Sequence, residues 1–284
     1  PYRPPSPRAP ADPAIHSQDM KPRHILATDI AEPILLPRAG GIGSDFTHRR
    51  QERETPNEDA AAIIAGNSDS GVIAVADGLG GQPSGNLAAG LVLRYLAEHL
   101  DGQYGEEQRE AVLNGLELAN AAILASGQGS ASTVAVVGID GNMVRAYYAG
   151  DSTILITGQR GRIKYQSMAH SPIGYAEAAG MLDEESAMFH QERHLVSNMV
   201  GTTDMHIEIS LPVELAPYDT VVVASDGVFD NLYPAEVIDL VRTGPLAVAA
   251  SRLLDRCHER MAAAESNSPH KPDDLAFVLY RRGR

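Results

Sequence analysis

The chain is constrained most by a series of short apolar runs, rich in Val, Ile and Ala, that each meet an aspartate at one end or at both. These runs are Gly71–Ala76, Thr133–Ile139, Val144–Ala149, Thr153–Thr157, Thr220–Ala224 and Leu275–Tyr280. Their β-branched residues, and the Gly or Asp residues that bound them, predict β-strands. A fold of this chain must therefore assemble the strands into sheets and accommodate the carboxylates at their ends.

Helical periodicity separates these runs. Apolar residues recur at helical spacing over Asn86–Leu100, Glu107–Ala125 and Pro245–Ala264, and Pro234 suits the first turn of a shorter helix. The strands come in clusters with pairs of helices between them and do not alternate strictly with helices. This order favours an α+β fold in which antiparallel sheets carry helices on their outer faces.

The apolar stripes of the first two helices predict which face each helix buries. The stripe of 86–100 is formed by Leu87, Leu91, Tyr95 and either Leu96 or His99, and that of 107–125 by Val112, Leu116, Ala119 and Ile123.

Proline is concentrated near the start of the chain, because half of the 18 prolines lie in the first 40 residues. Such a density opposes helices and strand ladders, so we expect residues 1–33 to form a flexible tail. A proline-recognition module is a possible partner for this tail. Residues 34–284 are expected to form a single domain, because no linker composition interrupts them.

Composition excludes several classes of protein. Asp and Glu number 37 against 23 Lys and Arg, and the net charge of −14 disfavours nucleic acid and anionic membranes as partners. The single cysteine, Cys257, excludes an internal disulfide and a thiolate zinc site. No apolar run is long enough to span a membrane. We therefore expect a cytoplasmic globular protein, and we expect a monomer.

Six acids stand at the beginning or end of predicted strands: Glu58, Asp59, Asp77, Asp151, Asp226 and Asp273. An ionised carboxylate at the edge of an apolar strand is costly unless a cation meets it. In assembled sheets these acids could converge at one end of the core, where they would raise one another's pKa unless divalent ions neutralised them. Oxygen ligands without Cys or His select Mg²⁺ or Mn²⁺. Each Asp-Gly pair alone is a turn signal, but the whole set predicts a metal site.

Seven segments resemble, in order, the motifs of the metal-dependent protein phosphatase family, type 2C. They are PNEDA (Pro56–Ala60), VADGLGG (Val75–Gly81), GSAST (Gly129–Thr133), YAGDS (Tyr148–Ser152), the flap-like His170–Thr202, ASDGVFDNL (Ala224–Leu232) and KPDDLAFVL (Lys271–Leu279). The flap-like segment is most similar to the bacterial form. The resemblance covers about residues 40–284 and implies a four-layer αββα sandwich of two antiparallel sheets flanked by helices, with a flap at about 163–199.

The resemblance also implies a centre of two or three Mn²⁺ or Mg²⁺ ions. Its ligands, direct or through water, would be Glu58, Asp59, Asp77, Gly78, Asp151, Asp226 and Asp273. Asp77 would bridge both ions, the Gly78 carbonyl would help to hold one of them, and Asp226 and Asp273 would complete the site of the other. Asp151 would hold a third, weaker ion together with Asp226.

The activity implied is hydrolysis of phosphoserine and phosphothreonine in proteins, in opposition to a serine/threonine kinase. A hydroxide activated between two divalent metals would attack phosphorus, and no phosphoenzyme would form. A cysteine-phosphatase mechanism is excluded, because Ala263 stands six residues after Cys257 where an arginine is needed. Two alternatives stay open: a pseudophosphatase that binds phosphoproteins as a scaffold, and a two-metal hydrolase of small phosphoesters.

Three positions depart from the family pattern. Glu54 stands where many members carry a phosphate-binding arginine, so Arg53 is the first candidate for that catalytic role, with Arg49 or Arg50 as substitutes. Leu79 replaces a histidine or methionine, which leaves the general acid open. The closing Asp273-Asp274-Leu275-Ala276 lacks a threonine that could support a metal ligand. The candidate histidines, each expected at the surface or in the flap, are His48, His170, His190 and His194.

Overall fold

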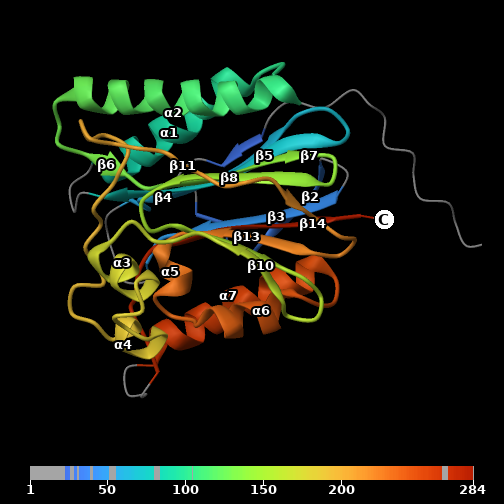
Figure 1. Cartoon of the computed structure of the whole chain (residues 1–284), viewed down its shortest axis with the longest axis vertical. Coiled ribbons are helices and arrows are strands. Elements are labelled where there is room, and N and C mark those ends of the chain that lie inside the picture. Colours follow the sequence, from blue (N-terminus) through green and yellow to red (C-terminus); the bar gives the residue numbers. More distant parts are fainter. Residues whose placement is uncertain are drawn as a thin grey trace, which may run out of the picture.

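The computed structural model describes residues 23–25, 29–30, 32–38, 41–50, 56–79, 84–103, 105–263 and 268–283. Two sheets lie face to face, with helices on the outer face of each (Figure 1). Every described strand pairing is antiparallel. The predicted α+β sandwich of four layers is therefore confirmed.

The first sheet has the strand order β1-β4-β5-β7-β8-β11, with β6 paired to β5 and β12 paired to β8. Its strands are β1 (Arg23–Ile25), β4 (Asp59–Ala65), β5 (Ser70–Leu79), β6 (Ala131–Ser132), β7 (Val134–Asp140), β8 (Met143–Ala149), β11 (Glu208–Ile209) and β12 (Val213–Glu214). Two long helices, α1 (Gly85–Leu100) and α2 (Glu106–Ser126), cover its outer face (Figure 1).

The second sheet has the order β10-β9-β13-β14-β3-β2. Its strands are β2 (Ile34–Arg38), β3 (Gly41–His48), β9 (Thr153–Thr157), β10 (Ile163–Gln166), β13 (Thr220–Ala224) and β14 (Leu275–Arg282). Its outer face carries α6 (Pro234–Val241) and α7 (Leu246–Ala262). Three short helices, α3 (Pro172–Ala178), α4 (Glu184–Met188) and α5 (Asp226–Phe229), lie toward one end of the sandwich (Figure 1).

The strands bury both of their faces, which explains why their sequences are apolar throughout. In β5, Val72 and Ala74 pack toward α1, whereas Ile73 and Val75 join the core between the two sheets. Side chains alternate between the faces of a strand, so a strand covered on both sides needs apolar residues at every position. The helical layer on the outer face of the second sheet forms a further core that contains Cys257.

The predicted stripe of helix α1 is confirmed only in part. Leu96 is buried and Leu91 and Tyr95 pack against the core, but Leu87 is 55% exposed. The buried face is shifted because small residues allow the helix to approach the sheet closely, and its buried positions include Ala88, Ala89, Val92 and Leu93. The predicted stripe of α2 is confirmed: Val112, Leu116, Ala119 and Ile123 are all buried.

Part of the expected tail belongs to the sheet. Arg23–Ile25 form β1, which pairs with Ile63–Ala61 of β4, and Ile30 donates its amide to the Thr47 carbonyl at 3.0 Å. The boundary of the predicted tail at residue 33 is therefore wrong. The reason is that no proline stands between Pro22 and Pro33, so the backbone there can donate hydrogen bonds. Residues 1–22 lie outside the described part of the chain.

The expected flap of 163–199 begins later than predicted. Its first four residues are β10, which pairs with β9 as the edge strand of the second sheet. The rest consists of α3, α4 and turns. In the described part of the chain, no helix is both long enough and apolar enough to cross a membrane.

Candidate active site and metal centre

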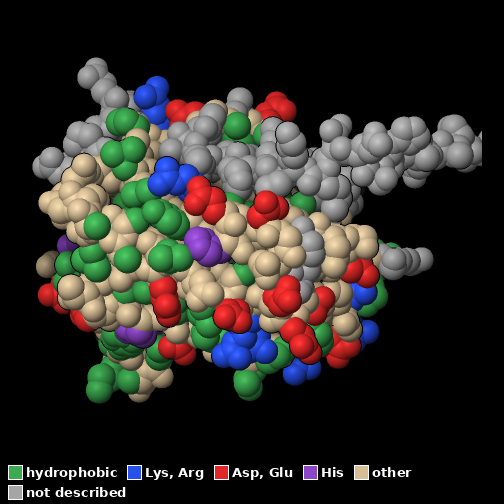
Figure 2. All heavy atoms as spheres, turned by 90° about the horizontal axis from the view of Figure 1, so that it is seen from above, with side chains coloured by type: hydrophobic (Ala, Val, Ile, Leu, Met, Phe, Trp, Pro, Cys, Tyr) green, Lys and Arg blue, Asp and Glu red, His purple; other side chains and the backbone are tan. Residues whose placement is uncertain are grey.

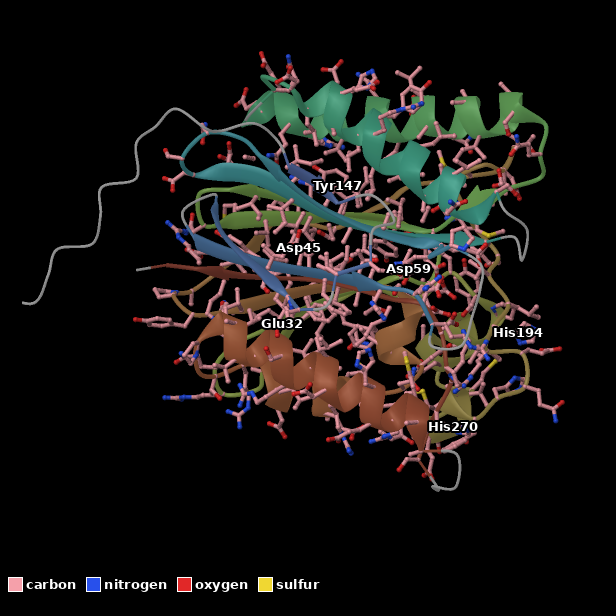
Figure 3. All side chains as sticks on the ribbon, turned by 180° about the vertical axis from the view of Figure 1, so that it is seen from behind. Glu32, Asp45, Asp59, Tyr147, His194 and His270 are labelled. Carbon is pink, nitrogen blue, oxygen red and sulfur yellow. The ribbon has the colours of Figure 1, made fainter. Side chains whose placement is uncertain are left out.

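The acids predicted from the sequence meet at one end of the sandwich. Asp59 opens β4 and lies directly opposite Asp77 of β5 in the strand register. The second sheet supplies its acids just outside the ends of strands β9, β13 and β14, and these acids are Asp151, Asp226 and Asp273. Figure 3 shows Asp59 at the same end of the molecule as His194 of the flap.

A cavity of about 180 Å³ lies at this convergence. Its lining consists of Glu58, Asp77, Gly78, Leu79, Asp151, His194, Val196, Asp226, Lys271, Asp273 and Asp274. Six of the seven predicted metal-binding residues therefore line one cavity. The seventh, Asp59, lies beside it in the core, where its Oδ2 accepts a hydrogen bond from the Ser225 hydroxyl at 2.6 Å.

The strands hold the cavity's backbone in place. The Asp77 carbonyl accepts hydrogen bonds from the Ser132 hydroxyl at 3.0 Å and the Thr133 amide at 2.8 Å. The Gly78 amide donates to the Glu58 carbonyl at 3.0 Å. The motif GSAST thus acts on the site through the main chain of β5.

Burial raises the pKa of several carboxyl groups at the cavity. Burial, followed by the charge of Asp59, raises the pKa of Asp77 well above its ordinary value. The same cause, followed by Asp226 and Asp230, raises the pKa of Asp151 to about 8. Burial also raises the pKa of Asp226 and of Asp273. Such shifts indicate more negative charge than the surrounding groups neutralise.

The chemistry of this donor set fits a hard divalent cation. Asp151 Oδ1 is buried and has no hydrogen-bond partner among the described residues. A Cβ added to Gly85 would lie 2.4 Å from Glu58 Oε1 and 2.9 Å from the Gly78 carbonyl oxygen, so the glycine leaves two oxygen donors room to converge. Oxygen donors of this kind suit Mg²⁺ or Mn²⁺. Among the described residues, however, no three acidic, histidine or cysteine side chains are already grouped as metal ligands.

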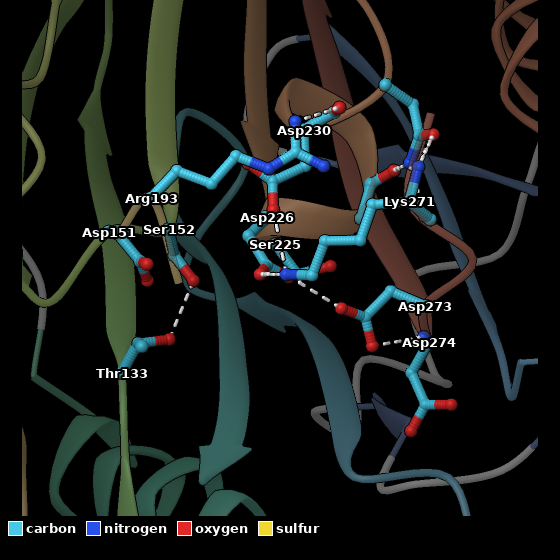
Figure 4. Close-up of polar contacts among 12 residues, drawn as sticks. Thr133, Asp151, Ser152, Arg193, Ser225, Asp226, Asp230, Lys271, Asp273 and Asp274 are labelled. Atoms are coloured by element: carbon cyan, nitrogen blue, oxygen red, sulfur yellow. Dashed lines mark hydrogen bonds and ion pairs between the residues drawn. The ribbon is translucent and has the colours of Figure 1, made fainter. Parts of the chain in front are cut away.

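Lys271 is a feature of the site that sequence reasoning missed. Its Nζ lies 2.5 Å from Asp226 Oδ2, 2.7 Å from Asp230 Oδ2 and 2.9 Å from Asp273 Oδ2 (Figure 4). Of the described residues that line the cavity, it is the only lysine or arginine. The signal in the sequence was its place two residues before Asp273, but its distance from Asp226 in the chain concealed the contact.

Asp274 has a structural task beside its neighbour. Its carboxylate accepts hydrogen bonds from the amides of Arg50 at 2.7 Å and Glu58 at 2.8 Å, so it fixes the entry to β4. The Ser225 hydroxyl is close to the backbone of Ala276, at 3.0 Å from its amide nitrogen, as well as to Asp59. The hydroxyl of Ser225, the residue that follows β13, thus reaches Asp59 although the closing motif lacks a threonine.

The predicted phosphate-binding arginines are only partly described. Arg53 lies outside the described residues. Arg49 directs its Nε toward Asp29 Oδ2 at 3.2 Å. His170 lies in the predicted flap segment, as expected, but its side chain is buried at 1% exposure. Its ring stacks against Tyr148, and its Nδ1 accepts a hydrogen bond from the amide of Gly150, which precedes Asp151.

A second cavity, of about 390 Å³, adjoins the acids and runs between α3, α4 and α5. Asp151 and Asp226 stand at one side of it, and its apolar lining includes Met168, Ile173 and Phe229. The acids thus face a groove large enough for several side chains.

The surface of the molecule over α2 differs from the acid cavity in its charges. Acidic and basic side chains are interspersed on its described part (Figure 2).

Comparison with known proteins identifies the family to which this fold belongs. A model of the family "Protein phosphatase 2C" matches residues 47–269. Protein phosphatase PhpP of Streptococcus pneumoniae is 28% identical over 208 residues, which are 69% of this chain and 83% of that protein. The chain therefore belongs to the protein phosphatase 2C family. It is a protein phosphatase of the bacterial type, as the resemblance predicted.

Solved structures share the fold. The serine/threonine phosphatase of S. agalactiae is 24% identical, with a TM-score of 0.72, and the match covers 84% of this chain and 98% of that one. The catalytic domain of the phosphatase PstP, solved in complex with two manganese ions, is 21% identical, with a TM-score of 0.67 over 85% of this chain and 98% of that one.

Proposed function

We propose that this phosphatase removes phosphate from phosphoserine and phosphothreonine in proteins, and that it uses Mn²⁺ or Mg²⁺ bound in the acid cavity. The observation that carries this proposal is the convergence of carboxylates with raised pKa values, from both sheets, on one cavity. Support comes from the relatives, which are named serine/threonine phosphatases, and from PstP, which was solved with manganese.

In this proposal Asp77, Asp226 and Asp273 hold two ions together with the Gly78 carbonyl. Glu58 and Asp59 act directly or through water, and Asp151 shares a third ion with Asp226. Bound divalent ions would supply the positive charge that activates the attacking water and offsets the charge on the phosphoryl oxygens. The protein's own contribution is to keep the ligand oxygens in place. The Asp77 carbonyl accepts a hydrogen bond from Ser132, and the Asp274 carboxylate accepts one from the Glu58 amide.

The groove between α3, α4 and α5 would receive the residues that flank the phosphorylated side chain, because it opens directly beside Asp151 and Asp226. Arg53, or else Arg49 or Arg50, would contact the phosphate. A serine/threonine kinase would oppose the reaction. A cytoplasmic location and a monomeric state remain predictions from the sequence.

The test is turnover of a phosphothreonine peptide after exhaustive chelation and after restoration of MnCl₂ or MgCl₂. We expect turnover only with metal, and a higher kcat/KM on the phosphopeptide than on p-nitrophenyl phosphate or phosphorylated metabolites. Full activity in the chelated protein would contradict the metal mechanism. Metal and phosphopeptide binding without turnover would instead identify a scaffold, and a preference for small phosphoesters would identify the other alternative.

A further inference from the structure

Lys271 places its ammonium among acids that, in the proposed function, belong to a metal ion. Its Nζ lies 2.5 Å from Asp226 Oδ2 and 2.9 Å from Asp273 Oδ2, between the two side chains (Figure 4). The Lys271 side chain is 25% exposed, so its charge is largely shielded from water. The pair of acids thus already holds one positive charge, and that charge is part of the chain.

We propose that Lys271 is a built-in cation that holds Asp226 and Asp273 in the metal-free enzyme and has to withdraw before a divalent ion can bind between them. This inference rests on the proposed function for the identity of these two ligands. A metal ion of the size of Mg²⁺ needs carboxylate oxygens at about 2.0–2.1 Å. An ammonium within hydrogen-bonding distance of the same two oxygens fills that space, and two cations that close would repel strongly.

The lysine has a second acid to which it can withdraw. Asp230 Oδ2 lies 2.7 Å from Nζ, and this residue is not among the proposed metal ligands. The main chain of Lys271 is held in place, because its amide donates to Asn231 Oδ1 at 2.8 Å and its carbonyl accepts from Asn231 Nδ2 at 2.9 Å. Only the flexible side chain therefore needs to move, from the Asp226–Asp273 pair toward Asp230.

This arrangement also explains why the acids converge without forming a ready group of metal ligands among the described residues. Oxygens that contact an ammonium at 2.5–2.9 Å lie farther from a common centre than oxygens that bind a small divalent ion. The ammonium of Lys271 attracts the carboxylates, yet it holds their oxygens farther apart than a small divalent ion would. Its effect on metal binding is therefore competition, and its effect on the metal-free fold is stabilisation.

Competition and stabilisation predict opposite changes when the charge is removed. In Lys271→Met the metal-free protein should unfold at a lower temperature, because the acids lose their cation. Mn²⁺ should nevertheless bind more tightly, by at least about tenfold in Kd, because no charge has to be displaced. A residue that only supports the fold would weaken both stability and metal binding.

The experiment compares the full chain with two variants by calorimetric Mn²⁺ titration and thermal unfolding. Lys164→Met is the matched control, because Lys164 Nζ pairs with buried Asp219 Oδ2 at 2.5 Å and neither residue lines the acid cavity. We expect lower stability in both variants and tighter Mn²⁺ binding only in Lys271→Met. Equal or weaker Mn²⁺ binding in Lys271→Met would overturn the proposal. A wild-type protein that binds no Mn²⁺ would contradict the proposed function itself.

A measurement on the unaltered protein covers the case in which Lys271→Met does not fold. The sequence has three lysines, Lys21, Lys164 and Lys271, so amine acetylation can be followed at each by mass spectrometry. Mn²⁺ should change the acetylation rate of Lys271 severalfold and leave that of Lys164 unchanged. A Lys271 rate that does not respond to saturating Mn²⁺ would show that the ammonium stays in place, and would overturn the proposal.

Discussion

Strand β13 has an aspartate beyond each of its ends, buried Asp219 before it and half-buried Asp226 after it, and the surroundings of the two differ. Asp219, before the strand, meets one ammonium, that of Lys164, and accepts the Ala216 amide at 2.8 Å. Asp226, after the strand, shares the single ammonium of Lys271 with two other carboxylates. At the first end charge is matched one to one. At the second end negative charge is in excess.

The difference explains why we propose a metal site at one end of β13 and not at the other. A matched buried pair satisfies its groups and leaves nothing for a ligand to neutralise. An excess of carboxylates that are partly removed from water is costly by itself and favours any added cation that reaches it. Both ends have a lysine and an acid, so the distinguishing property is the ratio of negative to positive charges.

The largest expected effect is a difference in turnover between substitutions at the two ends of β13. Asp226→Asn should lower kcat/KM by at least ~10²-fold, because a proposed ligand that organises the reacting charges is lost. Asp219→Asn should leave turnover of the folded protein unchanged and lower the free energy of unfolding by roughly 2 kcal/mol, because Lys164 loses its partner. Steady-state kinetics on a phosphothreonine peptide and urea unfolding measure the two quantities. Equal activity in both variants would contradict the different roles that we assign to Asp219 and Asp226.

A smaller effect is expected from a substitution that reduces the space in the acid cavity without altering its charge. In Gly85→Ala the new Cβ would press on Glu58 Oε1 and the Gly78 carbonyl, so we expect turnover to fall by about tenfold. Gly90→Ala is the control in the same helix, because a Cβ there meets nothing within 4 Å. It should retain activity and gain up to about 1 kcal/mol of stability. Unchanged kinetics in Gly85→Ala would argue that Glu58 and Gly78 take no part in the site.

The smallest effect is the pH dependence of stability in the chelated protein. A carboxyl whose pKa is raised on folding binds more protons in the folded state, so its contribution is present at low pH and is lost as the pH rises through the folded value. For Asp151 this window runs from about pH 4 to about pH 8. The melting temperature of the metal-free protein should fall by roughly 3–6 °C between pH 5 and pH 8. The fall should shrink in Asp151→Asn and in the presence of Mn²⁺, and an unchanged slope in both would contradict the assignment.

Much of the fold could be predicted because its signals are local. Thr153–Thr157 and Thr220–Ala224 were predicted with the bounds that β9 and β13 have in the structure, since short β-branched runs between turn residues identify strands. The buried face of α1 could not be predicted in the same way. Its alanines are buried because the sheet lies close to them, and that proximity is a property of the packing.

The candidate site shows the same division. Strand-end acids predicted Asp77, Asp226 and Asp273 at one place, and the structure brings them to one cavity. The contacts of Lys271 with Asp226 and Asp230 span 45 and 41 residues of chain, so no local pattern could reveal them. The burial of His170 against Tyr148 likewise depends on a contact between residues distant in the chain.

Strands that end in acids, in the order of a phosphatase family, can be read from the sequence, because strand formation and residue identity are local properties. Which acids share a cation, and which are matched one to one, depends on the folded chain. Electrostatic interaction varies with distance and burial in space, and neither is a local property of the sequence. Asp219 and Asp226, at opposite ends of β13, acquire different surroundings only when β10 and the segment before β14 bring their lysines to them.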